Sequence, residues 1–244
     1  MTAAPWLSVV VPFRDEAPSL AGLHAELRDA LDPLERPLEM LFVDDASRDD
    51  GPAVVEGLAA RDPRIRLLRL TPHAGQSAAL EAGFRAARGE IVATLDADGQ
   101  NDPADLPALL AALPGADCVC GVRVDRQDAR ATRLASWVAN RVRGRLLGDG
   151  VSDIGCSLRV MRAAPLSRIK LFRGGHRFLP AMLKMEGARV VERPVRHRPR
   201  LHGTSSYGIA SRLAVVWLDL LGMLWWARRI DRYEVKESPR PSGD

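Results

Sequence analysis

The chain has 244 residues, 46% of them hydrophobic, which is enough for one large α/β core. Its formal net charge of +4 is modest and gives no reason to expect a nucleic-acid partner. The three cysteines, Cys118, Cys120 and Cys156, exclude a disulfide framework and a Cys-x-x-Cys metal or redox motif, which favours a reducing compartment. The first seven residues lack a basic flank followed by an apolar stretch, so we expect no signal peptide.

Strand and helix patterns alternate in the first half of the chain. The apolar, β-branched run from Trp6 to Val11 is typical of a strand buried on both faces, and Pro12 should end it. Leucines at helical spacing from Leu20 to Leu31 predict a helix that ends near Asp32. Further strands are expected at 38–43, 65–70 and 91–95, and further helices at 52–60 and 76–87. This alternation predicts right-handed βαβ units and an α/β, doubly wound sheet.

The second half of the chain has a less regular pattern. It predicts a helix after Pro103, a strand at 117–121, a basic helix at 131–147, a helix at 178–186 and a strand at 189–195. We therefore expect one domain over residues 1–207, an apolar C-terminal helix over 208–236 and a disordered tail over 237–244.

Carboxylates follow three of the strands that should be buried. They are Asp15 and Glu16, Asp44 and Asp45, and Asp96 and Asp98. Ligands of open α/β sheets bind outside the carboxyl ends of the strands, so these three groups should meet at one crevice. A single aspartate after a strand is more often a turn or a helix cap, but three such sites at one edge weaken that interpretation.

The segment Leu95-Asp96-Ala97-Asp98-Gly99-Gln100 predicts a metal site. Two carboxylates two residues apart point to the same side of an extended chain, and Gln100 adds a further oxygen. Mg²⁺ or Mn²⁺ takes one or two carboxylates and completes its octahedron with water and substrate phosphates. A cation held in this way would neutralise the charge of a departing diphosphate.

Four segments together resemble the family 2 glycosyltransferases, in the branch of dolichol-phosphate mannose synthases and undecaprenyl-phosphate glycosyltransferases. They are Val9-Val10-Val11-Pro12-Phe13-Arg14-Asp15-Glu16, Phe42-Val43-Asp44-Asp45-Ala46-Ser47, Gly75-Gln76-Ser77-Ala78-Ala79-Leu80 and Asp96-Ala97-Asp98-Gly99-Gln100-Asn101-Asp102-Pro103. The resemblance extends to about Tyr207 and implies a GT-A fold, in which a Rossmann-like mixed sheet carries helices on both faces.

The resemblance also implies roles for individual residues. It places Pro12, Arg14 and Glu16 beside the nucleotide, Val43 and Asp45 against the nucleoside, Ala97 in the site wall, and Asp96, Asp98 and Gln100 on the metal. Arg14 stands where the family usually has tyrosine, and Gly99 where it often has leucine.

Basic residues of the second half complete the set of expected site residues. Arg123 and Arg133 resemble arginines that contact the transferring sugar phosphate. The run 196–207 is similar to the family's Arg-x-x-Gly-x-Ser-Lys-Tyr loop, which closes on donor diphosphate and acceptor phosphate; it supplies Arg200 and Ser205, while Ser206 replaces the usual lysine. The alternative for this run is a solvated basic strand. Asp153 matches a family position near the acceptor, or it caps a loop.

These observations favour an inverting enzyme that moves a sugar from a UDP- or GDP-sugar to a polyprenyl phosphate, with the nucleoside diphosphate leaving onto Asp98 and the cation. A phosphate monoester is already an anion at neutral pH, so such an enzyme needs cations to position its acceptor rather than a carboxylate to deprotonate it. One alternative is a transferase that acts on a saccharide or protein hydroxyl in cell-envelope glycan synthesis. Another is a noncatalytic protein that binds nucleotide sugars.

The apolar stretch from Leu213 to Ala227 bears on location. It is shorter than the roughly 20 residues of a membrane span, and Asp219 near its centre argues against crossing the bilayer. We expect a helix that lies in the membrane interface, with the enzyme peripheral on the cytoplasmic face of the plasma membrane. The alternative is a buried helix or one that joins two copies of the chain.

Overall fold

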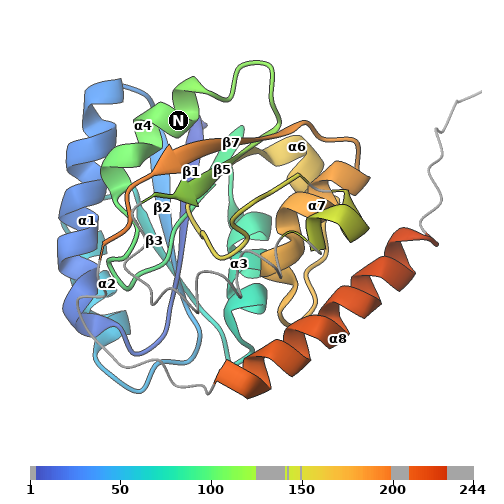
Figure 1. The fold of residues 1–244 in the computed structure, drawn as a ribbon. Coiled ribbons are helices and arrows are strands. Elements are labelled where there is room, and N and C mark those ends of the chain that lie inside the picture. The colour runs from blue at the N-terminus through green and yellow to red at the C-terminus, as the bar shows by residue number, and fades with distance from the viewer. Residues whose placement is uncertain (1–3, 125–140, 142, 149, 199–208, 230–244) are drawn as a thin grey trace, which may run out of the picture.

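The computed structural model describes residues 4–124, 141, 143–148, 150–198 and 209–229 (Figure 1). Within this part of the chain, seven strands form one mixed sheet in the order β3-β2-β1-β4-β6-β5-β7. The strands are β1 (Leu7–Phe13), β2 (Leu38–Asp44), β3 (Ile65–Arg69), β4 (Ile91–Thr94), β5 (Cys118–Arg123), β6 (Arg159–Arg162) and β7 (Val190–Val195). All neighbouring strands are parallel except β6, which runs antiparallel to both β4 and β5.

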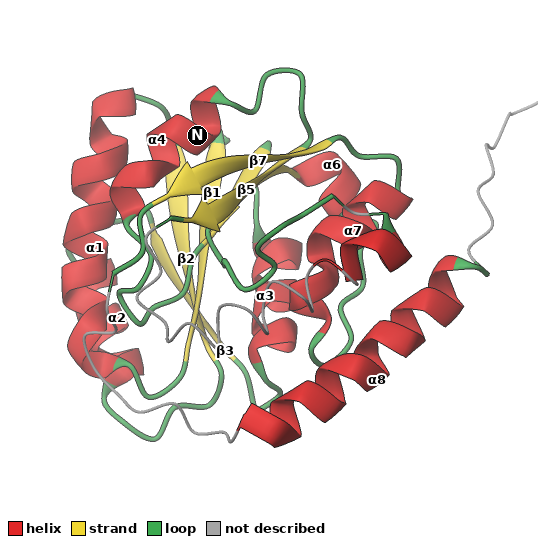
Figure 2. Ribbon diagram, in the orientation of Figure 1, coloured by secondary structure: helices red, strands yellow, loops and turns green. Residues whose placement is uncertain are grey.

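Helices cover both faces of the sheet (Figure 2). On one face lie α1 (Ala17–Leu31), α2 (Gly51–Ala59) and α4 (Leu106–Ala111), and on the other lie α3 (Gln76–Ala86), α6 (Ala163–Leu166), α7 (Leu179–Met185) and α8 (Ile209–Ala227). Short 3-10 helices are η1 (Asp32–Leu34), η2 (Pro103–Asp105) and η3 (Gly175–Phe178).

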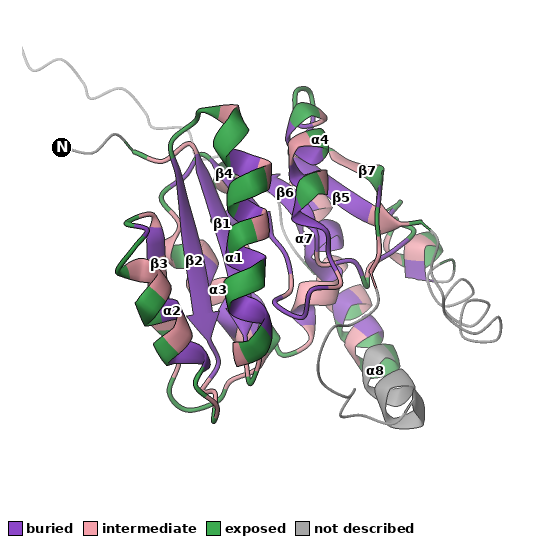
Figure 3. Ribbon diagram, turned by 90° about the vertical axis from the view of Figure 1, so that its left-hand side faces the viewer, coloured by how far each residue is buried: buried purple, intermediate pink, exposed green. Residues whose placement is uncertain are grey.

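Strand β1 is buried on both faces because its side chains alternate between the two helix layers. Figure 3 shows β1 coloured as buried. Val9 and Val11 pack in the core beneath α1, whereas Val10 packs in the core beneath α3, and all three are 0% exposed. Gly83 lets α3 approach this closely, because a Cβ at that position would collide with Val10. The continuous apolar run read from the sequence is therefore a central strand.

The expectation that Pro12 ends the first strand is wrong. Strand β1 continues to Phe13, with Pro12 in register with Val43 of β2. On its other side, β1 pairs with β4 only from Leu7 to Val10, so Pro12 lies beyond the end of that ladder. The N–H that proline lacks is not needed for pairing with β4.

Most other expected elements of the first half lie within two residues of their predicted bounds. Strand β6 was not predicted, and it separates β4 from β5 in the sheet. The expected basic helix at 131–147 lies mostly outside the described residues, as does the expected disordered tail. Within the range expected for the C-terminal helix, 208–236, the structure describes α8 (Ile209–Ala227), and among the described residues we find no helix long and apolar enough to cross a membrane.

Candidate active site

At least one carboxylate from the end of each of β1, β2 and β4 lines a shared cavity of about 380 Å³ at the carboxyl ends of these strands, as predicted. Asp45, Asp96 and Asp98 all contribute to its wall. The full lining is Pro12, Phe13, Arg14, Glu16, Asp45, His73, Gly75, Gln76, Ala79, Asp96, Ala97 and Asp98.

Two of the strand-end aspartates serve as turn residues instead. Asp44 is 2% exposed and accepts a hydrogen bond from the backbone N–H of Ser47. Asp15 has a φ of 55° and accepts from the backbone N–H of Arg48, which ties the loop after β1 to the loop after β2. The common structural role of such aspartates therefore applies to these two, and neither lines the cavity.

At the β4 end of the cavity, Asp96 and Asp98 form a close acidic pair. The side-chain amide of Gln76 donates to Asp96 Oδ1 at 2.7 Å, and the backbone N–H of Gln100 donates to Asp98 Oδ1 at 3.1 Å. Burial and the negative charge of Asp98 raise the pKa of Asp96 to about 6. A cation between the two carboxylates would remove this repulsion.

At the β2 end of the cavity, Asp45 holds the loop that leads into α3. It accepts hydrogen bonds from the backbone N–H groups of Ala74 and Gly75 at 2.8 and 2.9 Å, and His73 Nδ1 lies 2.8 Å from Asp45 Oδ2. Gly75 has a φ of +92°, a conformation that favours glycine at the start of this helix. His73 and Gln76 are thereby brought to the cavity wall.

A second cavity of about 190 Å³ lies on the other side of Asp96, and Gln76 and Asp96 line both cavities. Its further lining is Leu80, Thr94, Leu95, Ile154, Gly155, Cys156, Ser157, Arg159, His176, Arg177 and Leu179. Arg159 is only 4% exposed and donates to the backbone carbonyls of His176 and Ile154, so it holds two segments of this wall together. Burial and the positive charges of Arg177 and Arg159 lower the pKa of His176 to about 3, so this imidazole is neutral at physiological pH.

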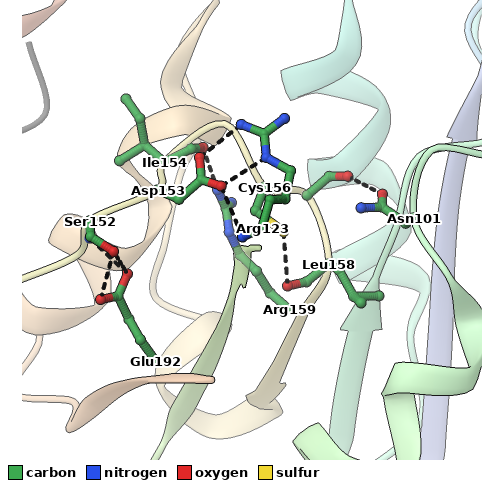
Figure 4. Close-up of polar contacts among 10 residues, drawn as sticks. Asn101, Arg123, Ser152, Asp153, Ile154, Cys156, Leu158, Arg159 and Glu192 are labelled. Carbon is green, nitrogen blue, oxygen red and sulfur yellow. Dashed lines mark hydrogen bonds and ion pairs between the residues drawn. The ribbon is translucent and has the colours of Figure 1, made fainter. Parts of the chain in front are cut away.

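Arg123 and Asp153 form a two-pronged ion pair beside the second cavity (Figure 4). Arg123 donates from Nε to Asp153 Oδ2 at 2.7 Å and from Nη2 to Oδ1 at 2.8 Å, and its backbone N–H also donates to Oδ2. Asp153 is therefore the ion-pair partner of Arg123, and its expected place near the acceptor stays a prediction.

The described start of the basic run, residues 196–198, lies against the loop that follows β4. The backbone N–H of Arg198 donates to the carbonyl of Gln100, and the Arg196 and Arg198 guanidinium groups both pair with Asp102, at 3.1 and 2.8 Å. His197 forms an isolated bridge with Asn101. The expected metal-binding loop and the base of the expected closing loop are therefore joined.

Several expected site residues have a different placement or lie outside the described part. Val43 is 0% exposed, so its side chain belongs to the core, and Gln100 and Arg123 line neither cavity. Arg133, Arg200 and Ser205 fall outside the described residues. No sequence pattern singles out His73, Arg159, His176 or Arg177 as site residues, and Gln76 lies in a recognised motif that assigns it no role.

Comparison with known proteins gives consistent matches. A model of the family described as Glycosyl transferase family 2 matches residues 8–170. A dodecaprenyl-phosphate galacturonate synthase of Rhizobium johnstonii is 36% identical over 228 residues, 91% of this chain and 67% of that protein. An undecaprenyl-phosphate 4-deoxy-4-formamido-L-arabinose transferase of Pseudomonas aeruginosa is 36% identical over 217 residues, 88% of this chain and 64% of that protein.

The fold has solved counterparts. The structure of a mannosyltransferase from Pyrobaculum calidifontis in complex with GDP-Man and Mn²⁺ superimposes with a TM-score of 0.68 at 24% identity, over 96% of this chain and 67% of that one. The chain thus spans about two thirds of the length of these three proteins.

Proposed function

This chain belongs to glycosyl transferase family 2 and has the GT-A fold, and from that membership we propose that it transfers a sugar from a nucleotide-sugar donor to a polyprenyl phosphate. The observation that carries the proposal is the single cavity at the ends of β1, β2 and β4, where Asp45, Asp96 and Asp98 meet. One relative is named a dodecaprenyl-phosphate galacturonate synthase and another an undecaprenyl-phosphate 4-deoxy-4-formamido-L-arabinose transferase, and these names support the choice of acceptor.

Mg²⁺ or Mn²⁺ is the cofactor of this proposal, held by Asp96 and Asp98 with Gln100 as a further oxygen donor. The mutual repulsion of the two carboxylates supports a cation at this place. Among the described residues, no group of three or more His, Cys, Asp and Glu side chains is gathered to hold a metal. A hard cation bound by two carboxylates would complete its shell with phosphate oxygens and water. The bound metal would neutralise the departing diphosphate.

The reaction is a direct displacement with inversion. An acceptor phosphate oxygen forms the new bond to the anomeric carbon as the bond to the nucleoside diphosphate breaks, and the electron pair leaves with the diphosphate. Pro12, Arg14 and Glu16 line the donor cavity, where they would orient the nucleotide. Arg133, Arg200 and Ser205 keep their proposed roles toward the phosphates.

The acceptor half fits an anionic nucleophile. Two arginines, Arg159 and Arg177, line the second cavity beside Asp96. His176 is neutral there, and its low pKa makes it too weak a base to deprotonate an acceptor hydroxyl. Asp153 is engaged by Arg123, so it serves to hold that guanidinium in place. A hydroxyl acceptor would instead require a general base among these groups.

Helix α8 is the proposed contact with the membrane surface. Leu220 and Met223 are buried against the domain, whereas Trp217, Leu218, Leu221 and Trp225 are between 46% and 68% exposed. Arg229 lies over the Trp225 ring at 4.7 Å and Arg228 is exposed. Tryptophan next to arginine suits the headgroup boundary, so the enzyme would lie peripherally on the cytoplasmic face, near a lipid-borne acceptor.

The test is transfer of a radiolabelled sugar from UDP- and GDP-sugars to short polyprenyl phosphates. We expect the label to partition into organic solvent, turnover to stop in chelator, and Mg²⁺ or Mn²⁺ to restore it. Label that appears only in a water-soluble saccharide or in protein would replace the lipid acceptor by a hydroxyl. If the chain binds the donor but neither transfers the sugar nor slowly hydrolyses the donor, it is a binding protein. Full turnover in chelator would refute the metal-assisted reaction.

A further inference from the structure

Asp45 has little capacity left to recognise a ligand directly. It is 4% exposed, and its two oxygens accept from the backbone N–H groups of Ala74 and Gly75 and from the His73 ring. A carboxylate with three short contacts to the loop that precedes α3 acts mainly to fix that loop. The group presented to the cavity by this arrangement is the imidazole of His73.

The orientation of His73 defines which of its atoms can serve a ligand. A carboxylate only accepts hydrogen bonds, so the 2.8 Å contact with Asp45 places the proton on Nδ1. In the neutral ring, Nε2 then carries a lone pair, on the side of the ring that faces away from Nδ1. The His73 side chain is 47% exposed and lines the larger cavity.

The sheet sets the distance between this histidine and the acidic pair. Strand β1 lies between β2 and β4, and neighbouring strands are about 4.8 Å apart, so the two ends of the cavity are separated by about 10 Å. A nucleoside diphosphate whose phosphates lie at Asp96 and Asp98 would reach the β2 end with its base. His73 is therefore at the end of the cavity where the base would lie.

We propose that His73 selects the nucleobase of the donor, with Asp45 as its positioning residue. With its proton on Nδ1, the imidazole accepts a hydrogen bond at Nε2 from the ring N–H of uracil, thymine or guanine. Cytosine and adenine have a lone pair at the corresponding ring nitrogen. His73 Nε2 and that ring nitrogen would then both be acceptors, and neither would receive a hydrogen bond. This inference rests on the proposed donor class and narrows it to nucleotides with a ring N–H.

The experiment is calorimetric titration of UDP, GDP, CDP and ADP into the full chain with Mn²⁺. One hydrogen bond in a half-buried site corresponds to about a tenfold change in affinity, so the better of UDP and GDP should bind about tenfold more tightly than CDP and ADP. His73→Phe keeps a ring of similar size without the acceptor, and it should reduce this preference to about twofold or less. His73→Gln, whose amide carbonyl can still accept, should retain the affinity for the preferred nucleotide.

Thr71→Ala is the matched control, because Thr71 is an exposed residue of the same loop that does not line the cavity. It should bind all four nucleotides as the unchanged chain does. If His73→Phe lowers the affinity for all four nucleotides alike, the substitution has only weakened the loop, and the inference is overturned. An undiminished preference for UDP or GDP over CDP and ADP would also overturn it. The titration contains no acceptor, so its result does not depend on whether the chain transfers a sugar to a lipid. If lipid transfer is normal but the titration shows no effect of His73→Phe on nucleotide preference, the role of His73 is rejected and the proposed function is not.

Discussion

Asp102 provides a test of whether the loop after β4 and the basic run work as a unit. This carboxylate is 3% exposed, accepts from the backbone N–H of Ala104 at the start of η2, and pairs with Arg196 and Arg198. Replacing it with alanine removes a helix cap, which costs about 1 kcal/mol, and two ion pairs. Arg196 is 59% exposed and Arg198, 35% exposed, keeps Glu26 as a second partner, so solvent screening limits the pairs to about 1 kcal/mol together.

Asp102→Ala should therefore lower the free energy of unfolding by about 2 kcal/mol. Combined with Arg198→Ala in a double-mutant cycle, it should show a coupling energy of about 0.5 to 1 kcal/mol in urea unfolding. The transfer rate should fall by about tenfold, since a 1 Å shift of positioning groups already costs more than that in well-ordered sites. Arg168→Ala breaks an exposed pair with Glu186 and is the control, with an expected change below about 0.5 kcal/mol and full activity. Coupling below about 0.3 kcal/mol together with unchanged transfer would refute the reasoning.

Three further predictions concern stability and membrane contact. Hydrogen bonding from Arg64 holds the pKa of Asp62 below its ordinary 3.8, so this carboxylate stabilises the fold above about pH 4, and the contribution is lost as the pH falls further. In Asp62→Asn, the free energy of unfolding measured in urea should therefore fall less between pH 5 and 3 than it does in the unchanged chain. An unchanged pH profile would contradict this prediction. Gly83→Ala should lower the free energy of unfolding by about 1 to 3 kcal/mol because its Cβ collides with a β1 side chain, whereas Gly22→Ala in α1 meets nothing within 4 Å and should raise it by about 0.5 kcal/mol. Trp225→Glu should reduce the fraction of protein that floats with anionic vesicles several-fold, while the nucleotide affinity stays unchanged. If the substitution instead converts a dimer to a monomer without loss of flotation, the exposed side of α8 joins two copies of the chain.

The first half of the fold could be predicted because its signals are local. Buried strands such as β1 are continuous apolar runs, and α1 has leucines at helical spacing, so neither depends on knowing the partner. Strand β6 could not be found in this way, since its four residues begin and end with arginine and show no usable period. The carbonyls that satisfy the buried Arg159 belong to Ile154 and His176, which lie outside the strand, so the strand's own pattern does not reveal them.

The site was predictable to the level of strand ends but not of individual contacts. The sheet geometry brings Asp45, Asp96 and Asp98 together irrespective of loop details, and this convergence is observed. Which aspartates face the cavity depends on turn geometry, which is why Asp15 and Asp44 have other duties. The role of Gln100 and of the residues outside the described part stays a prediction.

The reversed direction of β6 has an architectural consequence. Because β6 runs opposite to β4, Arg159 at its beginning lies beside Thr94 at the end of β4, so the segment before β6 reaches the same rim as the segments after the other strands. One wall of the smaller cavity is therefore built by chain that enters the sheet, while the larger cavity is built by chain that leaves it. Under the proposed function, insertions or exchanges ahead of residue 159 would alter the acceptor side while the ends of β1, β2 and β4, on the donor side, keep their geometry.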